Sequence, residues 1–356
     1  MPLIDGDTVD TAALAHARMA APIARGCIRV ANDDFRVDED CPVVLSGAGE
    51  HLWCRIQKDG LTTADAAQRL SRAAGVHPRH IGFAGQKDRH AVTTQWFSLA
   101  WPIKVDAPEL PDEPALRVLD IARHDRKLKR GAHRGNRFTL RVRDVDGSRP
   151  ELDADLARIA RDGVPNYFGP QRFGQAGRNI ELARALFAGK RLSRDRRGFA
   201  LSAARSLLFN AVLHARVIDG SWNRLIDGDA VMLDGSHSLF ARNSSGQTAA
   251  ELDARSAAFD IHPSGPLPGR EIDPVVEGEA GQLEQRVLAE FADLQEGLVQ
   301  CGVDAARRAL RLPVHDLEHA WEDSTLVLSF WLPTGAFATS VLREVVQVSE
   351  PARNAP

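Results

Sequence analysis

The sequence predicts an α+β protein with two domains, and three observations support this class. Short runs with an apolar residue at every second position, which are typical of strands, alternate along the chain with amphipathic stretches that are typical of helices. The length of 356 residues exceeds the usual size of one domain. The chain closes with a strand, a turn and a helix suited to a main core. We therefore expect residues 1–160 and 313–356 to build one domain around an inserted domain at 161–312.

The segment CIRVANDDFRVDED, which starts at Cys27, predicts two short strands. Apolar residues alternate at Ile28 and Val30 and again at Phe35 and Val37, and an Asn-Asp-Asp turn separates the two pairs. The next segment, HLWCRIQKDG, alternates in the same way. We expect these strands to form one edge or hairpin set of a sheet.

A capped helix follows at TTADAAQRLSRAAG. Thr62 is a good N-cap, and Gly75 is a typical stop signal after the last small or apolar residue. The segment that comes next, Ile81 to Ala84, predicts a short apolar strand that opens into a loop.

The rest of the chain continues the mixture of strands and helices. RFTLRVRDV predicts a strand with Phe138, Leu140 and Val142 on one face, and ELDADLARIARDG predicts a helix that ends at Gly163. Trp331 closes a strand that a Pro-Thr-Gly turn joins to the last helix. Other helices are expected at 179–188, 202–218, 282–300 and 304–310, with a strand at DAVML and a Gly/Pro-rich stretch at 262–269.

Composition favours a soluble globular protein. The chain is 44% hydrophobic and 26% charged, and it has no apolar run of the roughly 18 residues that span a bilayer. Its first residues lack the cationic start of a signal peptide, so we expect a cytoplasmic location. The four cysteines show no CxxC spacing, which favours reduced packing thiols over disulfides or a zinc site.

Positive charge is concentrated in one segment, RHDRKLKRGAHRGNR at 123–137. It holds seven Lys or Arg against one Asp, in a chain whose net charge is −3. Such a strip on an acidic body is expected where a protein holds a polyanion at one place, although a solvated surface would show the same composition. The candidate phosphate contacts are Arg126, Lys127, Lys129, Arg130 and Arg134.

The segment GFAGQKDRHAVTTQWFSL at 82–99 crowds four ionisable side chains into a turn. Its glycines do not have the spacing of a phosphate-binding P-loop, and the chain contains no HExxH, GxSxG or calcium-type acidic motif. Asp88 remains as a candidate nucleophile or base, because the flanking Lys87 and Arg89 favour an ionised carboxylate. An ordinary turn aspartate is the alternative from spacing alone.

Five segments together resemble the motif series of the TruD family of tRNA pseudouridine synthases, from about Gly26 to about Val346. They are GFAGQKDRHAVTTQWFSL, RGNRFTL, VPNYFGPQRFG, LSAARSLLFN and FWLPTGAFATSVLRE. The resemblance implies a pseudouridine-synthase catalytic domain with a mixed, largely antiparallel sheet and flanking helices, interrupted by an inserted α/β TRUD domain. RNA would bind between the two.

The resemblance also implies roles for particular residues. The catalytic aspartate of the family falls on Asp88, and its basic partner falls on Arg29. The Gly-Asn-x-Phe motif places Asn136 near the catalytic loop and Phe138 against the target base. Glu39 either supports this site or is an exposed strand carboxylate.

Further residues are expected to meet RNA. They are Lys87, Arg89 and His90 beside Asp88, where Lys87 can also steady the loop, and Asn166, Gln171 and Arg172 in VPNYFGPQRFG. Tyr167 is the one tyrosine of the chain, and we expect it to pack rather than to react.

By resemblance the protein is an isomerase that converts uridine 13 in the D-arm of tRNA to pseudouridine. The reaction adds no atom and changes no oxidation state, so no cofactor or metal is expected. The expected partner is tRNA, with no membrane and no obligatory protein partner, and a monomer is the default. The alternatives are a non-catalytic RNA-binding protein or RNA chaperone on the same fold and, more distantly, a nuclease, which the absent acidic metal motif disfavours.

Overall fold

The computed structural model describes residues 4–5, 8–9, 14, 16–17, 20–270 and 276–351. The contacts within the chain divide it into two compact units. The large-sheet unit comprises residues 23–153, 314–338 and 345–356, and the helical unit comprises residues 1–22, 154–313 and 339–344. That residues 161–312 form an inserted TRUD domain stays a prediction.

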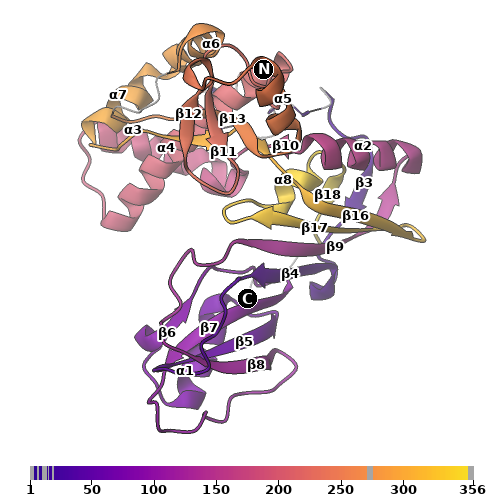
Figure 1. Ribbon diagram of the computed structural model, residues 1–356, viewed down its shortest axis with the longest axis vertical. Coiled ribbons are helices and arrows are strands. Elements are labelled where there is room, and N and C mark those ends of the chain that lie inside the picture. Colours follow the sequence, from indigo (N-terminus) through magenta and orange to yellow (C-terminus); the bar gives the residue numbers. More distant parts are fainter. Residues whose placement is uncertain are drawn as a thin grey trace. The chain divides into compact units, whose positions relative to one another are not determined.

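The large-sheet unit is built on one mixed sheet, as the sequence predicts (Figure 1). Neighbouring strands on its main path are antiparallel, except that β4 runs parallel to β7. The path runs in the order β16 (His315–Glu322), β17 (Thr325–Pro333), β9 (Gly135–Asp146), β4 (Phe35–Asp40), β7 (Val92–Ala100), β5 (His51–Asp59) and β8 (Leu116–His124).

Three short strands extend this sheet. β3 (Arg25–Cys27) pairs antiparallel with β9 and parallel with β18 (Gln347–Ser349), so a late strand lies beside an early one. β6 (Ile81–Phe83) pairs antiparallel with β7. The segment between β6 and β7 is therefore a loop at one end of the sheet.

The edge or hairpin set predicted for the early strands is wrong, because β7 lies between β4 and β5 and neither is an edge strand. The predicted patterns of β9 and α1 are confirmed. Phe138, Leu140 and Val142 of β9 are buried on one face. Helix α1 (Thr63–Ala74) begins after Thr62, whose Oγ1 accepts a hydrogen bond from the Asp65 amide at 3.0 Å, and it ends at Gly75 with φ 64°. Its apolar side packs on β5, β7 and β8 in one cluster with Leu52, Cys54, Ile56, Phe97, Leu99 and Leu116.

The predicted strand at Ile28 and Val30 is wrong. β3 ends at Cys27, and the next turn of chain places Arg29 in the left-handed region, with φ 58°. A non-glycine residue with positive φ cannot continue an extended strand. Val30 is 52% exposed as a result, whereas the second predicted strand is present as β4.

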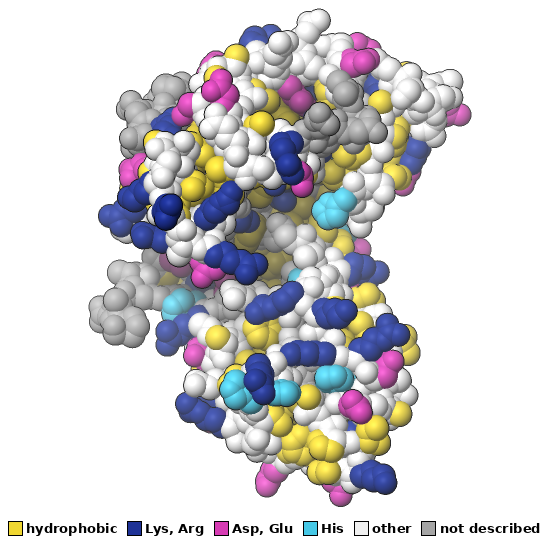
Figure 2. Space-filling model, turned by 90° about the vertical axis from the view of Figure 1, so that its left-hand side faces the viewer, with side chains coloured by type: hydrophobic (Ala, Val, Ile, Leu, Met, Phe, Trp, Pro, Cys, Tyr) yellow, Lys and Arg dark blue, Asp and Glu magenta, His cyan; other side chains and the backbone are white. Residues whose placement is uncertain are grey.

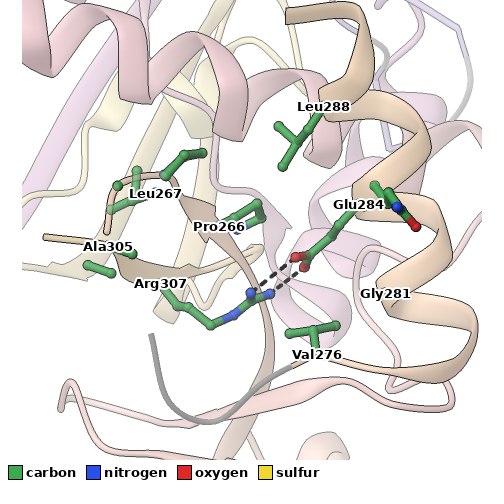
Figure 3. A pocket seen from close by; sticks show the side chains of 12 residues that line it. Pro266, Leu267, Val276, Gly281, Glu284, Leu288, Ala305 and Arg307 are labelled. Atoms are coloured by element: carbon green, nitrogen blue, oxygen red, sulfur yellow. Dashed lines mark hydrogen bonds and ion pairs between the residues drawn. The ribbon is translucent and has the colours of Figure 1, made fainter. Parts of the chain in front are cut away.

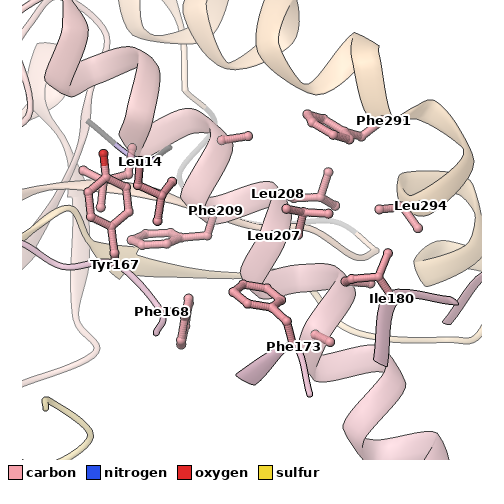
Figure 4. Packing of buried hydrophobic residues seen from close by; sticks show 14 of the residues in the cluster. Leu14, Tyr167, Phe168, Phe173, Ile180, Leu207, Leu208, Phe209, Phe291 and Leu294 are labelled. Carbon is pink, nitrogen blue, oxygen red and sulfur yellow. The ribbon is translucent and has the colours of Figure 1, made fainter. Parts of the chain in front are cut away.

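The helical unit is centred on α4 (Arg194–Ile218), which starts eight residues before the predicted helix at 202. Its buried side packs with residues of neighbouring segments, among them Phe173, Ile180, Phe291 and Leu294 (Figure 4). The other helices are α2 (Arg149–Asp162), which crosses the boundary between the units, α3 (Arg178–Phe187), α5 (Ala249–Ala257), α6 (Gly278–Leu288), α7 (Ala292–Gln300) and α8 (Ala338–Leu342).

A small sheet completes this unit and corrects one further prediction. Its order is β12 (Leu239–Ala241), β11 (Ala230–Leu233), β13 (Ile261–Leu267) and β14 (Ala306–Ala309), while β10 (Val164–Pro165) pairs with β15 (Arg311–Leu312). The helix predicted at 304–310 is therefore wrong, because pairing of β14 with β13 overrides its local preference. The Gly/Pro-rich stretch at 262–269 is largely strand β13.

The described residues also bear on the expectations about membrane spans and cysteines. No helix among them has both the length and the apolar content to cross a bilayer. The cysteines are free thiols, and burial raises the pKa of Cys54 to about 12, which makes this thiol a packing group.

Two glycines with open space around them allow a test of backbone strain. Gly75 has φ 64° at the end of α1, whereas Gly198 lies inside α4 without a positive φ, and an added Cβ would meet nothing within 4 Å at either position. We expect Gly75→Ala to lower the free energy of unfolding by about 1 kcal/mol because of the left-handed backbone. Gly198→Ala should instead raise it by about 0.5 kcal/mol. Urea denaturation measures both, and effects of equal sign would contradict this explanation.

Candidate active site

Asp88 lies in the loop that joins β6 to β7, and its side chain is 58% exposed. A reacting group can therefore reach this carboxylate. Hydrogen bonds hold the loop along its length. Its backbone oxygens at Ala84 and Gly85 accept from Gly131 N at 2.8 Å and from Gln95 Nε2 at 3.1 Å. Its donors Lys87 N and Arg89 Nε bond to Thr63 Oγ1 at 2.8 Å and to Gly60 O at 3.3 Å.

Arg29 is the ion-pair partner of Asp88, as the sequence resemblance implied. One guanidinium nitrogen lies 2.7 Å from Asp88 Oδ2, and the other terminal nitrogen lies 2.8 Å from Glu350 Oε1. The guanidinium also stacks on the Phe35 ring, 4.1 Å from its centroid. Arg29 is thus fixed on three sides, and its charge-assisted bond orients the Asp88 carboxylate.

Glu350 and Lys58 belong to this site but were missed in the sequence. Glu350 follows β18, and no motif marks it. Lys58 is fully buried at the end of β5, where its ammonium group donates to Asp88 O at 2.8 Å and to Leu61 O at 2.6 Å. Lys58 therefore positions the backbone of Asp88 from inside the unit.

Glu39 and Lys87 form a buried ion pair beneath the loop. Lys87 Nζ lies 2.7 Å from Glu39 Oε2, and Glu39 Oε1 accepts from the Trp96 amide at 3.2 Å. Side-chain exposure is 5% for Lys87 and 0% for Glu39. The structure therefore favours the supporting role for Glu39, and Lys87 steadies the loop from within instead of presenting its ammonium group to RNA.

His133 also lies against this loop and was not recognised in the sequence. Its ring is near Gly85, where an added Cβ would meet His133 Cε1 at 3.0 Å. Burial lowers the pKa of His133, and the positive charge of Lys87 lowers it further. A neutral imidazole therefore packs beside the loop.

Asn136 and Phe138 lie on β9, which pairs with both β4 and β17. Asn136 is opposite Glu39, and Phe138 is opposite Val37 and Phe330. Because paired residues of antiparallel strands share a face, Asn136 lies next to the Glu39–Lys87 pair. Among the described residues, no hydrogen-bond partner reaches Asn136 Oδ1.

The Phe138 ring is largely covered by other aromatic rings. It is 6% exposed, stacks on Phe330 at 5.5 Å between centroids and meets the edge of Phe35 at 6.3 Å. Phe35 in turn carries Arg29, so a chain of direct contacts joins Phe138 to Asp88. The structure thus brings together the predicted catalytic set of Asp88, Arg29, Asn136 and Phe138 in one unit.

The basic strip forms the connection between β8 and β9. Arg126, Lys127, Lys129, Arg130 and Arg134 are all exposed. Four of them have a contact within the unit: Arg130 stacks on Phe83 at 3.6 Å, Lys127 donates to Arg79 O at 2.7 Å, Arg134 donates to Asp40 Oδ2 at 2.8 Å, and Arg126 Nε lies 3.4 Å from Asp125 Oδ2. Figure 2 shows a face of the molecule on which Lys and Arg side chains gather. Arg89 and His90 are exposed in the neighbouring loop.

The remaining predicted RNA contacts lie in the helical unit. Gln171 is exposed, Arg172 is partly buried and Asn166 is buried. Tyr167 is 3% exposed within the hydrophobic core around α4 (Figure 4). Burial raises the pKa of its phenol, which fits the expected packing role.

A pocket of about 330 Å³ is present in the helical unit (Figure 3), and none of the site residues described above lines it. It is lined mainly by apolar groups such as Pro266, Leu267 and Leu288, and its charged pair, Glu284 with Arg307, is mutually neutralised. No group of three His, Cys, Asp or Glu within the described ranges is arranged to hold a metal ion.

The fold and the site together define a class of protein. An accessible aspartate in a loop of a mixed sheet, paired with an arginine and adjoined by amide and aromatic side chains, is the arrangement that the resemblance implied for a pseudouridine synthase. The family model of tRNA pseudouridine synthase D (TruD) matches residues 18–190 and 183–345. The chain therefore belongs to the tRNA pseudouridine synthase D family. Pseudouridine synthesis is an isomerisation, so this is a family of isomerases.

Individual relatives align with this chain over nearly its whole length. The tRNA pseudouridine synthase D of Methylococcus capsulatus is 51% identical and aligns over 91% of each chain. That of Xanthomonas campestris (strain 8004) is 44% identical over 98% of each chain. The crystal structure of the "Putative tRNA pseudouridine synthase D (TruD)" from Methanosarcina mazei has a TM-score of 0.70 at 22% identity, with 90% of this chain and 93% of that one covered, which shows the same fold.

The buried Lys58 gives the stability of the protein a specific pH dependence. Burial lowers the pKa of Lys58 to about 8, below its ordinary 10.5, so above pH 8 the unfolded chain binds more protons than the folded one. Stability should then rise with pH in this window. Between pH 8 and 10, we expect the wild type to gain about 2 kcal/mol of unfolding free energy relative to Lys58→Met.

Urea denaturation at several pH values measures this difference. Lys104→Met, at an exposed lysine of the same unit, is the matched control and should run parallel to the wild type. A Lys58→Met curve that also stays parallel would show that Lys58 keeps its ordinary proton affinity.

Proposed function

We propose that this protein isomerises uridine 13 in the D-arm of tRNA to pseudouridine, with Asp88 as the catalytic nucleophile or base. The observation that carries the proposal is the ion pair of 2.7 Å between Arg29 and Asp88, placed in an accessible and firmly anchored loop. Membership of the tRNA pseudouridine synthase D family and the names of its relatives support the substrate. The position of the target uridine rests on the sequence resemblance.

The reaction breaks the glycosidic bond between C1′ and N1, turns the uracil and forms a bond between C1′ and C5, while C5 loses its proton and N1 gains one. Asp88 would either add to C6 of the base, attack C1′ or remove the C2′ proton. Each route needs an ionised carboxylate in a fixed direction, which the bond from Arg29 supplies. Lys58 and the Glu39–Lys87 pair hold the loop so that the carboxylate keeps its place.

The target base must leave its stack before it can react, which costs a few kcal/mol. The resemblance places Phe138 against the target base; because this ring is only 6% exposed, it would touch the base at its small uncovered part and would replace little of the lost stacking. Asn136 Oδ1 is a buried acceptor, and the uracil N3–H group is a donor of suitable chemistry for it. These two side chains would therefore hold the base near Asp88.

The basic strip and the neighbouring Arg89 and His90 would contact the RNA backbone. A non-catalytic RNA-binding protein would need only this surface. It would have no use for an arginine that is locked onto an exposed aspartate, so the intact Asp88 site favours the enzyme.

Substitution of Asp88 tests the proposed catalysis. We expect Asp88→Asn to abolish pseudouridine formation in tRNA transcripts, because an amide can neither attack nor accept the proton, while RNA binding is retained. Mapping of pseudouridine and filter binding measure the two properties. Asp33→Asn is the matched control, since Asp33 is an exposed aspartate that also pairs with an arginine, Arg36. Undiminished product from Asp88→Asn would remove Asp88 from the mechanism.

Charge reversal tests the basic strip. We expect Lys127→Glu with Arg130→Glu to weaken tRNA binding by tenfold or more at low salt and to reduce its salt dependence. Lys104→Glu with Arg117→Glu makes the same charge change at exposed positions of the same unit outside the strip and should have a smaller effect. Equal binding isotherms for the two double variants would mean that the strip is only a solvated surface.

A further inference from the structure

Two arginines of the helical unit share one aromatic ring. The Arg308 guanidinium on β14 lies 4.4 Å from the centroid of the Phe168 ring, and that of Arg172 lies 5.4 Å from the same centroid. Arg308 also donates to Asn166 Oδ1 at 2.5 Å, and Arg172 donates to Ser202 Oγ at 3.1 Å. The two cations are therefore held close to each other by neutral partners.

Neither charge is neutralised. Within the described residues, no Asp or Glu forms a salt bridge with Arg172 or Arg308, although the adjacent Arg307 pairs with Glu284. The Arg308 Nε is buried and meets no acceptor in the same part of the chain. Burial, followed by the repulsion of Arg172, lowers the pKa of Arg308 to about 10, so Arg308 stays charged at neutral pH. Partly buried like charges without a counter-charge are unfavourable unless an anion binds.

The frame around this pair is rigid. The Asn210 side chain clamps the backbone of Phe168 through two hydrogen bonds, from Phe168 N and to Phe168 O, both of 2.9 Å. Asn166 is fixed in the same way by its bond to Ala309 O at 2.8 Å. An anion that binds here would not have to order the side chains first, which favours binding.

We propose that Arg172 and Arg308 form a binding site for a backbone phosphate of the RNA substrate. Planar guanidinium groups match phosphate oxygens in geometry and charge, and the terminal nitrogens of these two side chains would donate to the oxygens of a phosphodiester. This inference rests on the proposed function for the identity of the RNA. It assigns the NYFGPQRFG segment a binding role: Asn166 and Phe168 hold the two arginines, and the arginines hold the phosphate.

Neutral substitutions test the site. We expect the double variant Arg172→Gln, Arg308→Gln to bind a tRNA transcript roughly tenfold more weakly at low salt, with the slope of log K against log salt smaller by about one. The rate of a single turnover at saturating tRNA should stay within about threefold, because these residues belong to the helical unit and Asp88 and its partners to the large-sheet unit. Fluorescence anisotropy and rapid-quench assays measure the two quantities.

Matched controls separate charge from packing. Arg255 also lies over an aromatic ring, at 5.8 Å from Phe240, but its charge is paired with Asp260. Arg255→Gln should leave the salt slope unchanged. Arg308→Lys keeps the charge and should restore part of the affinity. If Arg308→Gln fails to fold, as judged by thermal unfolding, the partly exposed Arg172→Gln and Arg172→Glu carry the test with a graded loss of binding.

The outcomes distinguish the two proposals. Unchanged affinity and salt slope in folded variants would overturn the phosphate site, whether or not the wild type makes pseudouridine. A wild type that forms no pseudouridine but loses tRNA affinity in the double variant would overturn the proposed function and keep the phosphate site. A lower single-turnover rate at saturating tRNA with unchanged affinity would also contradict the phosphate site.

Discussion

The ion pair between Arg29 and Asp88 joins two segments that are 59 residues apart in the chain. Its geometry depends on the backbone at Arg29, where the chain leaves β3 with a positive φ of 58°. A non-glycine residue in this region costs free energy and persists only when the surrounding structure fixes it. Three contacts do so here, since Arg29 is bound to Asp88, bound to Glu350 and stacked on Phe35. The contacts that position Asp88 therefore also maintain the strained backbone at Arg29.

Buried cations hold the loop from the other side. Lys58 is taken wholly out of water to donate to two backbone carbonyls, one of them that of Asp88, and Lys87 is buried against Glu39. Burying such charges is unfavourable compared with apolar packing, so they add little net stability. Their effect is to restrict the conformation of the loop. Lys58 bonds a carbonyl of the loop and Lys87 bonds a carboxylate beneath it, so few alternative loop conformations keep both contacts. This is the property that a positioned catalytic carboxylate requires.

Local signals in the sequence predicted the parts that depend on local physics. The alternation at Phe138, Leu140 and Val142 gives the buried face of β9, and Thr62 with Gly75 gives the ends of α1. The motif resemblance located Asp88 and Arg29. The sequence did not predict Glu350 and Lys58, because their roles come from contacts between segments that are distant in the chain. Neither residue lies in a motif that would mark it. The helix predicted at 304–310 failed for the same reason, since pairing with β13 decides that segment.

Each unit contains arginine stacked on phenylalanine, and the charge around the stack decides what the arginine can do. Arg29 stacks on Phe35 and forms ion pairs with two carboxylates. Its charge is therefore neutralised within the protein, and its effect is to orient Asp88. Arg172 and Arg308 sit on Phe168 with hydroxyl and amide partners, so their charge remains available to an anion from outside. An aromatic ring fixes the plane of a guanidinium in both cases. The difference between a positioning residue and a binding residue then lies in the carboxylates nearby, which the sequence motifs alone do not reveal.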